Sequence, residues 1–232
     1  MLRLKSRHRL KCGDSTDAED VADLMDGAKA DMVFTDPPYG MNVVKSNGYN
    51  NGLGDAIDGV VGLVPRNKYR KIIGDDSIDT AKKSIDLCKE IPIQIWWGAN
   101  FYASHLPDNH AWICWDKENG EGFFADGELA WTNQSKQLRI FKHLWKGMIK
   151  ASEMFVKRVH PTQKPIALAE WCFENYGNPK SVIDLFLGSG STLIACEKTN
   201  RKCYGMELDE HYCSVILKRF SDYAEGSHVV KA

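Results

Sequence analysis

The chain has 232 residues, of which 43% are hydrophobic and 26% charged, and these values are typical of a single globular domain with its own core. No apolar run approaches the roughly 20 residues that span a membrane, and no apolar stretch follows the basic N-terminal segment as it would in a secretory signal, so we expect a cytoplasmic protein. The net charge of −1 does not by itself indicate a nucleic-acid-binding protein, although local basic patches bind phosphates whatever the total charge.

Short apolar runs alternate with helical patterns along the chain, and no low-complexity linker divides it. The expected elements are, in chain order, a strand at 9–12, a helix at 17–28, a strand at 31–35, a helix at 79–89, strands at 91–97 and 111–115, a helix at 165–176, a strand at 181–186, a helix at 191–199, a strand at 202–207 and a helix at 210–223. This alternation predicts a single α/β domain over residues 1–232 with a mostly parallel, doubly wound sheet.

The helix expected at 165–176 has the clearest pattern. Pro165 suits the first helical position, where its missing N–H costs nothing, and apolar residues then recur with helical spacing. Gly177 and Pro179 end it.

Two regions do not follow the alternation. Residues 40–66 are rich in Gly and Asn and predict a long flexible loop, and residues 117–158 are aromatic, basic and irregular. The seven cysteines include no CxxC pair, so we interpret them as reduced core residues and expect no metal site.

The segment Asp36-Pro37-Pro38-Tyr39 follows a predicted buried strand. Proline fixes φ and restricts the preceding residue, so this backbone is stiff and extended at the carboxyl end of the strand, where open α/β sheets bind ligands. The Asp36 carboxylate and the Pro37 carbonyl could each accept one N–H of an aromatic amine, which would aim the nitrogen lone pair at a methyl donor. Tyr39 offers a face for stacking a flipped base, a contact worth roughly 1–3 kcal/mol. The alternative is a Pro-Pro turn with a capping aspartate.

A second segment, from Asp184 to Thr192, joins a predicted buried strand to a helix and contains Gly188 and Gly190. Its glycines permit a tight turn against a ligand, and Glu207 ends the next strand, where an acid accepts the hydroxyls of a ribose. A plain strand–helix turn is one alternative. An NAD site is another, but its fingerprint requires a third glycine where this chain has Leu193.

These motifs and their order resemble those of the β-class DNA amino-methyltransferases. The matching segments are Gly13-Asp14, Asp36-Pro37-Pro38-Tyr39, Trp112-Ile113-Cys114-Trp115-Asp116-Lys117, His160-Pro161-Thr162-Gln163-Lys164-Pro165 and Phe186-Leu187-Gly188-Ser189-Gly190, so the resemblance covers nearly the whole chain. It implies methyl transfer from S-adenosylmethionine to an exocyclic amino group in DNA, without a covalent enzyme intermediate. An aspartate at position 36 resembles the adenine-N6 enzymes, whereas a serine there would indicate cytosine N4.

The resemblance also implies roles for the matching residues. Asp36, Pro37, Pro38 and Tyr39 would form the catalytic segment. Thr162 and Lys164 would lie near the methionine carboxylate of the cofactor, Glu207 at its ribose and Asp14 at its adenine. The methionine and sulfonium end would be held by Asp184, Phe186, Gly188, Ser189, Gly190, Ser191 and Thr192.

Residues 136–158 carry seven basic side chains and one acid, within the region where this family keeps its target-recognition segment. We therefore expect DNA contacts from Lys136, Arg139, Lys142 and Lys146, and from a second cluster containing Arg66, Lys68 and Arg70. The alternative for each cluster is a solvated charged surface. The recognition segment, at 117–158, is shorter than in many relatives, so a homodimer or modest specificity would be needed.

Two other functions remain open. One is a methyltransferase acting on RNA or on a protein amide, which more often carries asparagine at the position of Asp36. The other is a catalytically silent DNA-binding relative. A restriction-modification role fits the family, but the sequence does not identify the DNA site.

Overall fold

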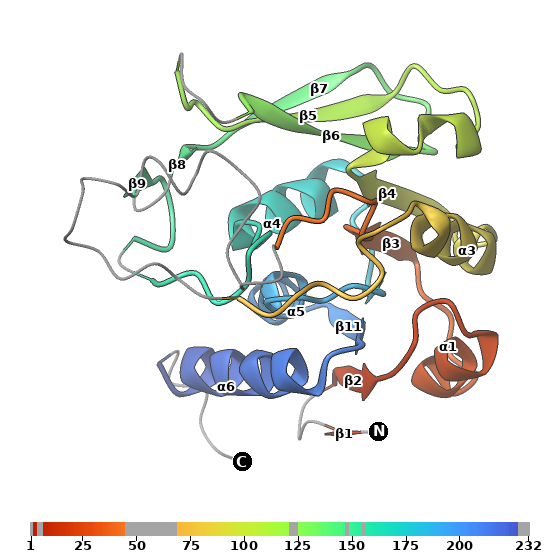
Figure 1. Cartoon of the computed structure of the whole chain (residues 1–232), viewed down its shortest axis with the longest axis vertical. Helices are drawn as coiled ribbons and strands as arrows, with labels where there is room; N and C mark the ends of the chain where they lie inside the picture. Colours follow the sequence, from red (N-terminus) through yellow and green to blue (C-terminus); the bar gives the residue numbers. More distant parts are fainter. Residues whose placement is uncertain are drawn as a thin grey trace.

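The computed structural model describes residues 2–3, 7–44, 69–120, 125–146, 149–154 and 156–226. These residues form a nine-stranded sheet and a separate two-stranded ribbon (Figure 1). The strands of the sheet, in spatial order, are β1 (Leu2–Arg3), β2 (Arg9–Cys12), β11 (Lys202–Glu207), β10 (Ser181–Asp184), β3 (Met32–Thr35), β4 (Ile93–Trp97), β6 (Gly127–Thr132), β5 (Trp112–Asp116) and β7 (Arg139–Lys142). The ribbon consists of β8 (Trp145–Lys146) and β9 (Ile149–Lys150).

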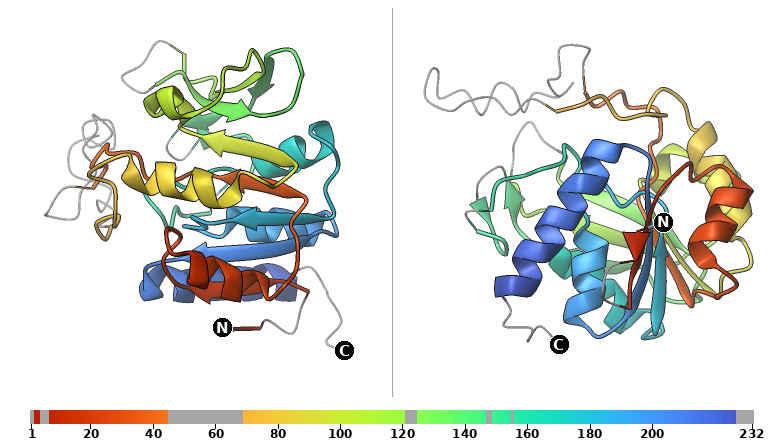
Figure 2. Two further views of the ribbon diagram at one scale, coloured as in Figure 1. Left: turned by 90° about the vertical axis from the view of Figure 1, so that its right-hand side faces the viewer. Right: turned by 90° about the horizontal axis from the view of Figure 1, so that it is seen from below.

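Neighbouring strands from β2 to β4 are all parallel. Only β1 and β6 run against their neighbours, so the expected mostly parallel sheet is confirmed. Helices α1 (Ala18–Met25) and α3 (Asp79–Cys88) cover one face, and α4 (Ile166–Asn175), α5 (Ser191–Lys198) and α6 (Glu210–Gly226) cover the other (Figure 2). Every element expected from the sequence is present, with ends shifted by at most three residues. None of the helices in the described ranges has the length and apolarity to cross a membrane.

The side chains of β3 show why the sheet needs both layers of helices. All four residues of this strand are buried, with Met32 and Phe34 in the core under α4, α5 and α6 and Val33 in the core under α1 and α3. Successive strand residues point to opposite faces, so a central parallel strand must be apolar on both.

The region at 117–158 corrects the expectation of an irregular segment. Its residues form β6 and β7, which extend the sheet, and the β8–β9 ribbon. Strand β6 is paired on both sides, with Trp131 opposite Trp96 of β4 and Trp112 of β5. This pairing buries Ala130 and Trp131, a tertiary effect that the short, glycine-led segment did not indicate.

Two smaller expectations also change. Pro165 is not the first helical residue but the N-cap of α4, with φ −65° and ψ 143°, and the Glu153 carboxylate accepts the amide of Ile166 at 3.0 Å. Five cysteines are buried as expected of core residues, but Cys12 is exposed because it ends β2.

The connections leave a crevice in the middle of the sheet. The chain passes from β10 through α5 to β11 on one side, and from β3 through α3 to β4 on the other, over opposite faces. In open α/β sheets, ligands bind outside the carboxyl ends of the strands at such a reversal. The crevice lies between the ends of β10 and β3.

Candidate active site

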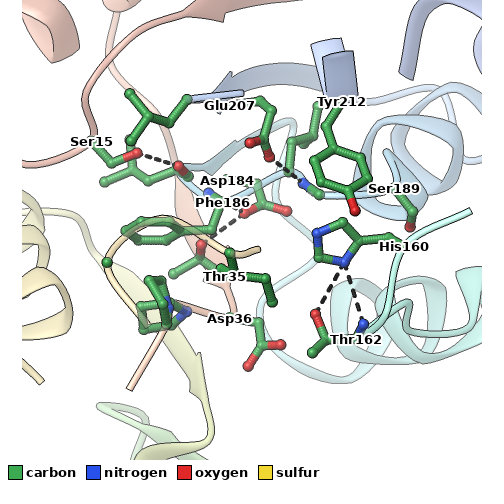
Figure 3. Close-up of a pocket in the computed structure, with 18 of the residues that line it drawn as sticks. Ser15, Thr35, Asp36, His160, Thr162, Asp184, Phe186, Ser189, Glu207 and Tyr212 are labelled. Carbon is green, nitrogen blue, oxygen red and sulfur yellow. Dashed lines mark hydrogen bonds between the residues drawn. The ribbon is translucent and has the colours of Figure 1, made fainter. Parts of the chain in front are cut away.

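A cavity of about 250 Å³ opens at this reversal and gathers the motifs that are far apart in the sequence. The predicted catalytic and cofactor-binding residues that line it are Asp14, Asp36, Pro37, Pro38, Tyr39, Thr162, Lys164, Asp184, Phe186, Gly188, Ser189, Ser191, Thr192 and Glu207. Figure 3 shows Glu207, Asp184 and Thr35 following one another along one side, with His160 and Thr162 opposite them. Gly190 is the predicted residue that does not line the cavity.

The glycine turn has the backbone that its sequence predicts. Gly188 and Gly190 have φ values of 52° and 79°, in the left-handed region where a side chain is strained. A Cβ on Gly188 would lie 3.3 Å from the His160 ring. Gly190 is the N-cap of α5 and has no side chain to bond the first amides of this helix.

Glu207 fastens this turn to the neighbouring strand. Its carboxylate accepts the amides of Gly188 at 2.9 Å and Asp209 at 3.0 Å. Burial raises the pKa of Glu207 above the usual value of a glutamate. The acid that ends β11 therefore already organises the glycine turn.

Asp184 joins the two strands that flank the crevice. Its Oδ1 accepts the Thr35 hydroxyl at 2.7 Å and the Phe186 amide at 3.1 Å. Burial raises the pKa of Asp184 to about 6, although these hydrogen bonds favour the ionised form. Sequence reasoning missed Thr35, whose signal was a polar residue at the end of an otherwise apolar strand.

Asp36 has one carboxylate oxygen engaged and one without a partner. Oδ2 contacts the ammonium of Lys164, whereas Oδ1 is buried and has no hydrogen-bond partner among the described residues. Burial raises the pKa of Asp36 despite the adjacent ammonium. Buried polar atoms are rarely left unpaired, so this oxygen is suited to accept a hydrogen bond from a ligand donor.

Lys164 is shared between two carboxylates. Besides Asp36, its Nζ lies 3.0 Å from Oε2 of Glu128, and the other oxygen of Glu128 lies 2.6 Å from Nζ of Lys117. Burial opposes the charge on Lys164, but Asp36 and Glu128 outweigh it and raise the pKa of this lysine. Burial likewise opposes ionisation of Glu128, yet the two ammonium groups lower its pKa to about 2. Glu128 was not predicted as a site residue, because nothing in its segment indicates a strand that joins the sheet.

Tyr39 is held by aromatic neighbours from the segment after β4. Its ring stacks on Phe101 with centroids 4.6 Å apart and an interplanar angle of 8°. A Cβ on Gly98 would lie 2.2 Å from the Tyr39 ring, so this close approach requires glycine. Phe101, half exposed in the 3-10 helix η1 (Ala99–Phe101), was not predicted as a site residue.

The His160 ring packs under the glycine turn. Its Nδ1 lies 3.4 Å from the amide and 3.1 Å from the hydroxyl of Thr162, and its ring meets Tyr212 edge-on with centroids 4.5 Å apart. Burial lowers the pKa of His160 to about 3, with Lys164 adding to the effect. The ring is therefore neutral at physiological pH and positions Thr162.

Arg219 of α6 braces the glycine turn from behind. Its Nη1 donates to the Ser189 carbonyl at 2.9 Å and to the Ser191 hydroxyl at 3.1 Å, while Nη2 pairs with Glu153. Glu153 in turn accepts the amide of Ile166 at the start of α4. This bridge connects the turn to the region at 117–158.

The predicted basic cluster is divided by the fold. Lys136 donates to the Asn175 carbonyl and lies 4.9 Å from the centroid of the Tyr176 ring, and Arg139 shares a shallow polar depression with it. Asn175 ends α4, whereas Ala169 of the same helix lines the cavity. Six residues of helix are about 9 Å long, so Lys136 contacts α4 roughly that far beyond the cavity.

Lys142 and Lys146 lie where β5 ends, closer than Lys136 to the contacts between Lys117, Glu128 and Lys164. Lys142 is 67% exposed, with its Nζ 3.8 Å from Asp116, and Lys146 donates to the Asn119 carbonyl at 3.1 Å. Arg70 pairs with Asp209 at the cavity at 2.8 Å. Arg66 and Lys68 lie outside the described residues.

The start of the loop expected at 40–66 is fixed by one buried acid. Asp75 accepts the backbone amides of Gly40, Met41 and Val43 at 3.2, 3.1 and 2.8 Å. These bonds hold the chain as it leaves Tyr39. Positions 45–66 of the expected loop lie outside the described residues.

Comparison with known proteins is consistent across sequence and fold. The family model N6_N4_Mtase, described as DNA methylase, matches residues 30–218. The Type II methyltransferase M2.DpnII of Streptococcus pneumoniae is 24% identical over 230 residues, covering 82% of this chain and 81% of that protein. The Type II methyltransferase M2.LlaDCHI of Lactococcus lactis subsp. cremoris is 27% identical over 127 residues, covering 52% of this chain but only 44% of that relative. Among solved structures, the M1.HpyAVI-SAM complex superposes with a TM-score of 0.54 at 20% identity, covering 91% of this chain and 98% of that one.

Proposed function

Because the chain belongs to the DNA methylase family, we propose that it transfers a methyl group from S-adenosylmethionine to an exocyclic amino group in DNA, with adenine N6 as the target. The observation that carries this proposal is the free Oδ1 of Asp36, buried beside a stacked Tyr39 at the edge of the cavity.

The cavity residues suit this cofactor. The glycine turn and the start of α5 present backbone amides, which favour the negative charge of a carboxylate. Glu207 at the end of β11 is positioned for ribose hydroxyls, and Asp14 lines the same side of the cavity for the adenine. When bound, S-adenosylmethionine supplies an electrophilic methyl group on a sulfonium centre.

Asp36 and the stiff Pro37-Pro38 backbone orient the target amine. Oδ1 of Asp36 accepts one N–H and the Pro37 carbonyl the other, so that the nitrogen lone pair is directed away from the base plane. Such orientation supplies several kcal/mol of a barrier by proximity. The methylated nitrogen is a strongly acidic ammonium, so its proton leaves to Asp36 or to water without a strong base.

Tyr39 provides the stacking face for the flipped base, and its position depends on Gly98 and Phe101. Adenine N6 is favoured over cytosine N4 by the aspartate at position 36, a feature in which this chain resembles the adenine enzymes. Cytosine N4 remains the second candidate because the family includes both.

DNA binding is proposed for the basic residues on the β5–β7 side. Lys142 and Lys146 lie nearest the cavity on this side, and Arg139, with a weaker contribution from Lys136, would contact phosphates farther along the duplex. Arg70, which pairs with Asp209 after β11, would contact DNA from the other side of the cavity, together with Arg66 and Lys68. Within a single domain, the segment 117–158 would serve as the target-recognition region. A homodimer would supply the recognition surface that this short segment lacks.

The direct test is to incubate the purified protein with labelled S-adenosylmethionine and unmodified duplex DNA, and to identify the labelled nucleoside by mass spectrometry. We expect N6-methyladenine. Detection of N4-methylcytosine instead would show that cytosine is the target base. The absence of label on any exocyclic nitrogen would refute the proposal.

The substitution Asp36→Ala provides the matched control for this test. It should reduce transfer by at least about 1,000-fold, because both orientation and charge are lost, while cofactor affinity changes less than about threefold. Equal loss of cofactor binding would assign Asp36 to the cofactor instead.

A further inference from the structure

Four charged side chains of alternating sign run from the region at 117–158 to the catalytic segment. They are Lys117 after β5, Glu128 on β6, Lys164 before α4 and Asp36 after β3. All four are largely buried, with exposed side-chain fractions from 11% for Lys164 to 27% for Glu128. Two positive and two negative charges cancel, which is the arrangement that makes buried ions tolerable.

The position of Glu128 is set by the sheet. It stands opposite Trp115 of β5, and two residues later Ala130 stands opposite Trp97 of β4. Strand pairing therefore fixes the backbone of Glu128, and its carboxylate contacts Lys164, so that the ammonium lies between two acids.

We propose that Glu128 and Lys164 are positioning residues for Asp36, an inference that rests on the proposed methyl transfer. Lys164 holds Oδ2 of Asp36 so that Oδ1 faces the incoming amine. Glu128 contacts the same ammonium group, which weakens the attraction of Lys164 for Asp36 and leaves Asp36 a stronger hydrogen-bond acceptor. Lys117 and Glu128, which lie in the region at 117–158, thereby affect how strongly the Asp36 carboxylate accepts a hydrogen bond.

The charges around Asp36 give this inference a distinctive signature. The side chains that act on it or respond to it are Lys164, Glu128, Lys117, Tyr39, Tyr102 and Asp184. Burial raises the pKa of Asp36, Lys164 lowers it, and Glu128 raises it. Neutralising Glu128 should therefore lower the pKa of Asp36, whereas neutralising Lys164 should raise it.

The experiment compares pH profiles of kcat/KM for the full-length wild type, Glu128→Gln and Lys164→Met, with cofactor affinity measured by calorimetry. The acidic limb should move to lower pH in Glu128→Gln and to higher pH in Lys164→Met. We expect kcat to fall about 10-fold in the first and about 100-fold in the second, since small misplacements of reacting groups cost about that much, with cofactor affinity within about threefold. Glu170→Gln, which breaks a pair with Lys198 outside the cavity, is the matched control and should leave the profile unchanged.

Removing Lys164 leaves two buried acids, and that variant could fail to fold. Thermal melting identifies this case, and Lys117→Met then replaces it, because Lys117 also lowers the pKa of Asp36 and its loss should move the limb upward.

Three outcomes separate the inference from the function on which it rests. An active wild type whose variants shift the limb in the same direction, or not at all, overturns the inference alone. So does a Lys164→Met variant that loses cofactor affinity more than about 10-fold with kcat unchanged, because Lys164 would then serve the cofactor. An inactive wild type refutes the proposed function and the inference with it.

Discussion

The parallel half of the sheet and the flank formed by β6, β5 and β7 contribute to one cavity in different ways. In the parallel half, site residues belong to recognisable motifs, several of them at strand ends, such as Asp36 after β3 or Asp184 at the end of β10. In the flank, Glu128 reaches the site only because β6 pairs with both β4 and β5. The residues that line the cavity in the parallel half can therefore be recognised from short sequence motifs. The charges around the catalytic acid, in contrast, depend on which strands pair in the folded protein.

The bridge between the two halves gives the largest expected effect on cofactor affinity. Arg219→Met removes the hydrogen bonds that Arg219 makes to Ser189 and Ser191 and leaves Glu153 without its cationic partner. Hydrogen bonds to charged groups are worth about 1.5–3 kcal/mol, so cofactor affinity should fall about 10- to 100-fold in calorimetry. Lys218→Met, next to it but 77% exposed in a surface pair with Asp222, should change affinity less than twofold. If both substitutions reduced cofactor affinity equally, Arg219 would not be the residue that connects the glycine turn to the flank.

Two buried or partly buried histidines, one in each region, allow the pH dependence of folding stability to be compared between the regions. The folded-state pKa of His160 is about 3, below its unfolded value, so unfolding takes up a proton and stability falls as pH drops below about 6.5. The loss should approach about 1.4 kcal/mol per pH unit between pH 6 and pH 4, relative to His160→Asn, in urea unfolding. Burial also lowers the pKa of His143 in the flank, but this ring is less buried, and His143→Asn should reduce the acid sensitivity much less. A larger effect at His143 would contradict this ranking.

The smallest effect concerns the divided basic cluster. Lys142→Ala should weaken DNA binding a few-fold and reduce the slope of log affinity against log salt concentration by about 1, because one phosphate contact is lost. Lys136→Ala should act mainly on stability, because Lys136 caps the carbonyl end of α4 and covers Tyr176. Filter binding across a salt series together with thermal melting separates the two, and a salt slope that changes only for Lys136 would invert the assignment.

The sequence predicts the parallel half well because each of its signals is local. The buried strands β3 and β10 each contain consecutive apolar residues, Gly188 and Gly190 mark the turn, and Glu207 closes the following strand. The role of Thr35 is less visible, since it depends on β10 lying beside β3.

The strands of the flank could not be predicted from local sequence signals. β7 is mostly exposed and β6 owes its burial to partners on both sides, so neither shows the alternation of an independent strand. Glu128 therefore looks like a surface acid in the sequence, and only its contacts with Lys164 and Lys117 reveal its place at the site. Phe101 is hidden for a similar reason, because stacking on Tyr39 requires the turn at Gly98.

The three amides gathered by Asp75 have a consequence for how this chain can be altered. Gly40, Met41 and Val43 are held immediately after Tyr39, so the position of this backbone depends on a carboxylate that follows it by more than thirty residues in the chain. We therefore expect Asp75→Asn to loosen the segment from Gly40 to Val43, although Asp75 makes none of these bonds with Tyr39 or Asp36. A single buried carboxylate thus ties the segment that leaves the catalytic motif to a distant part of the chain.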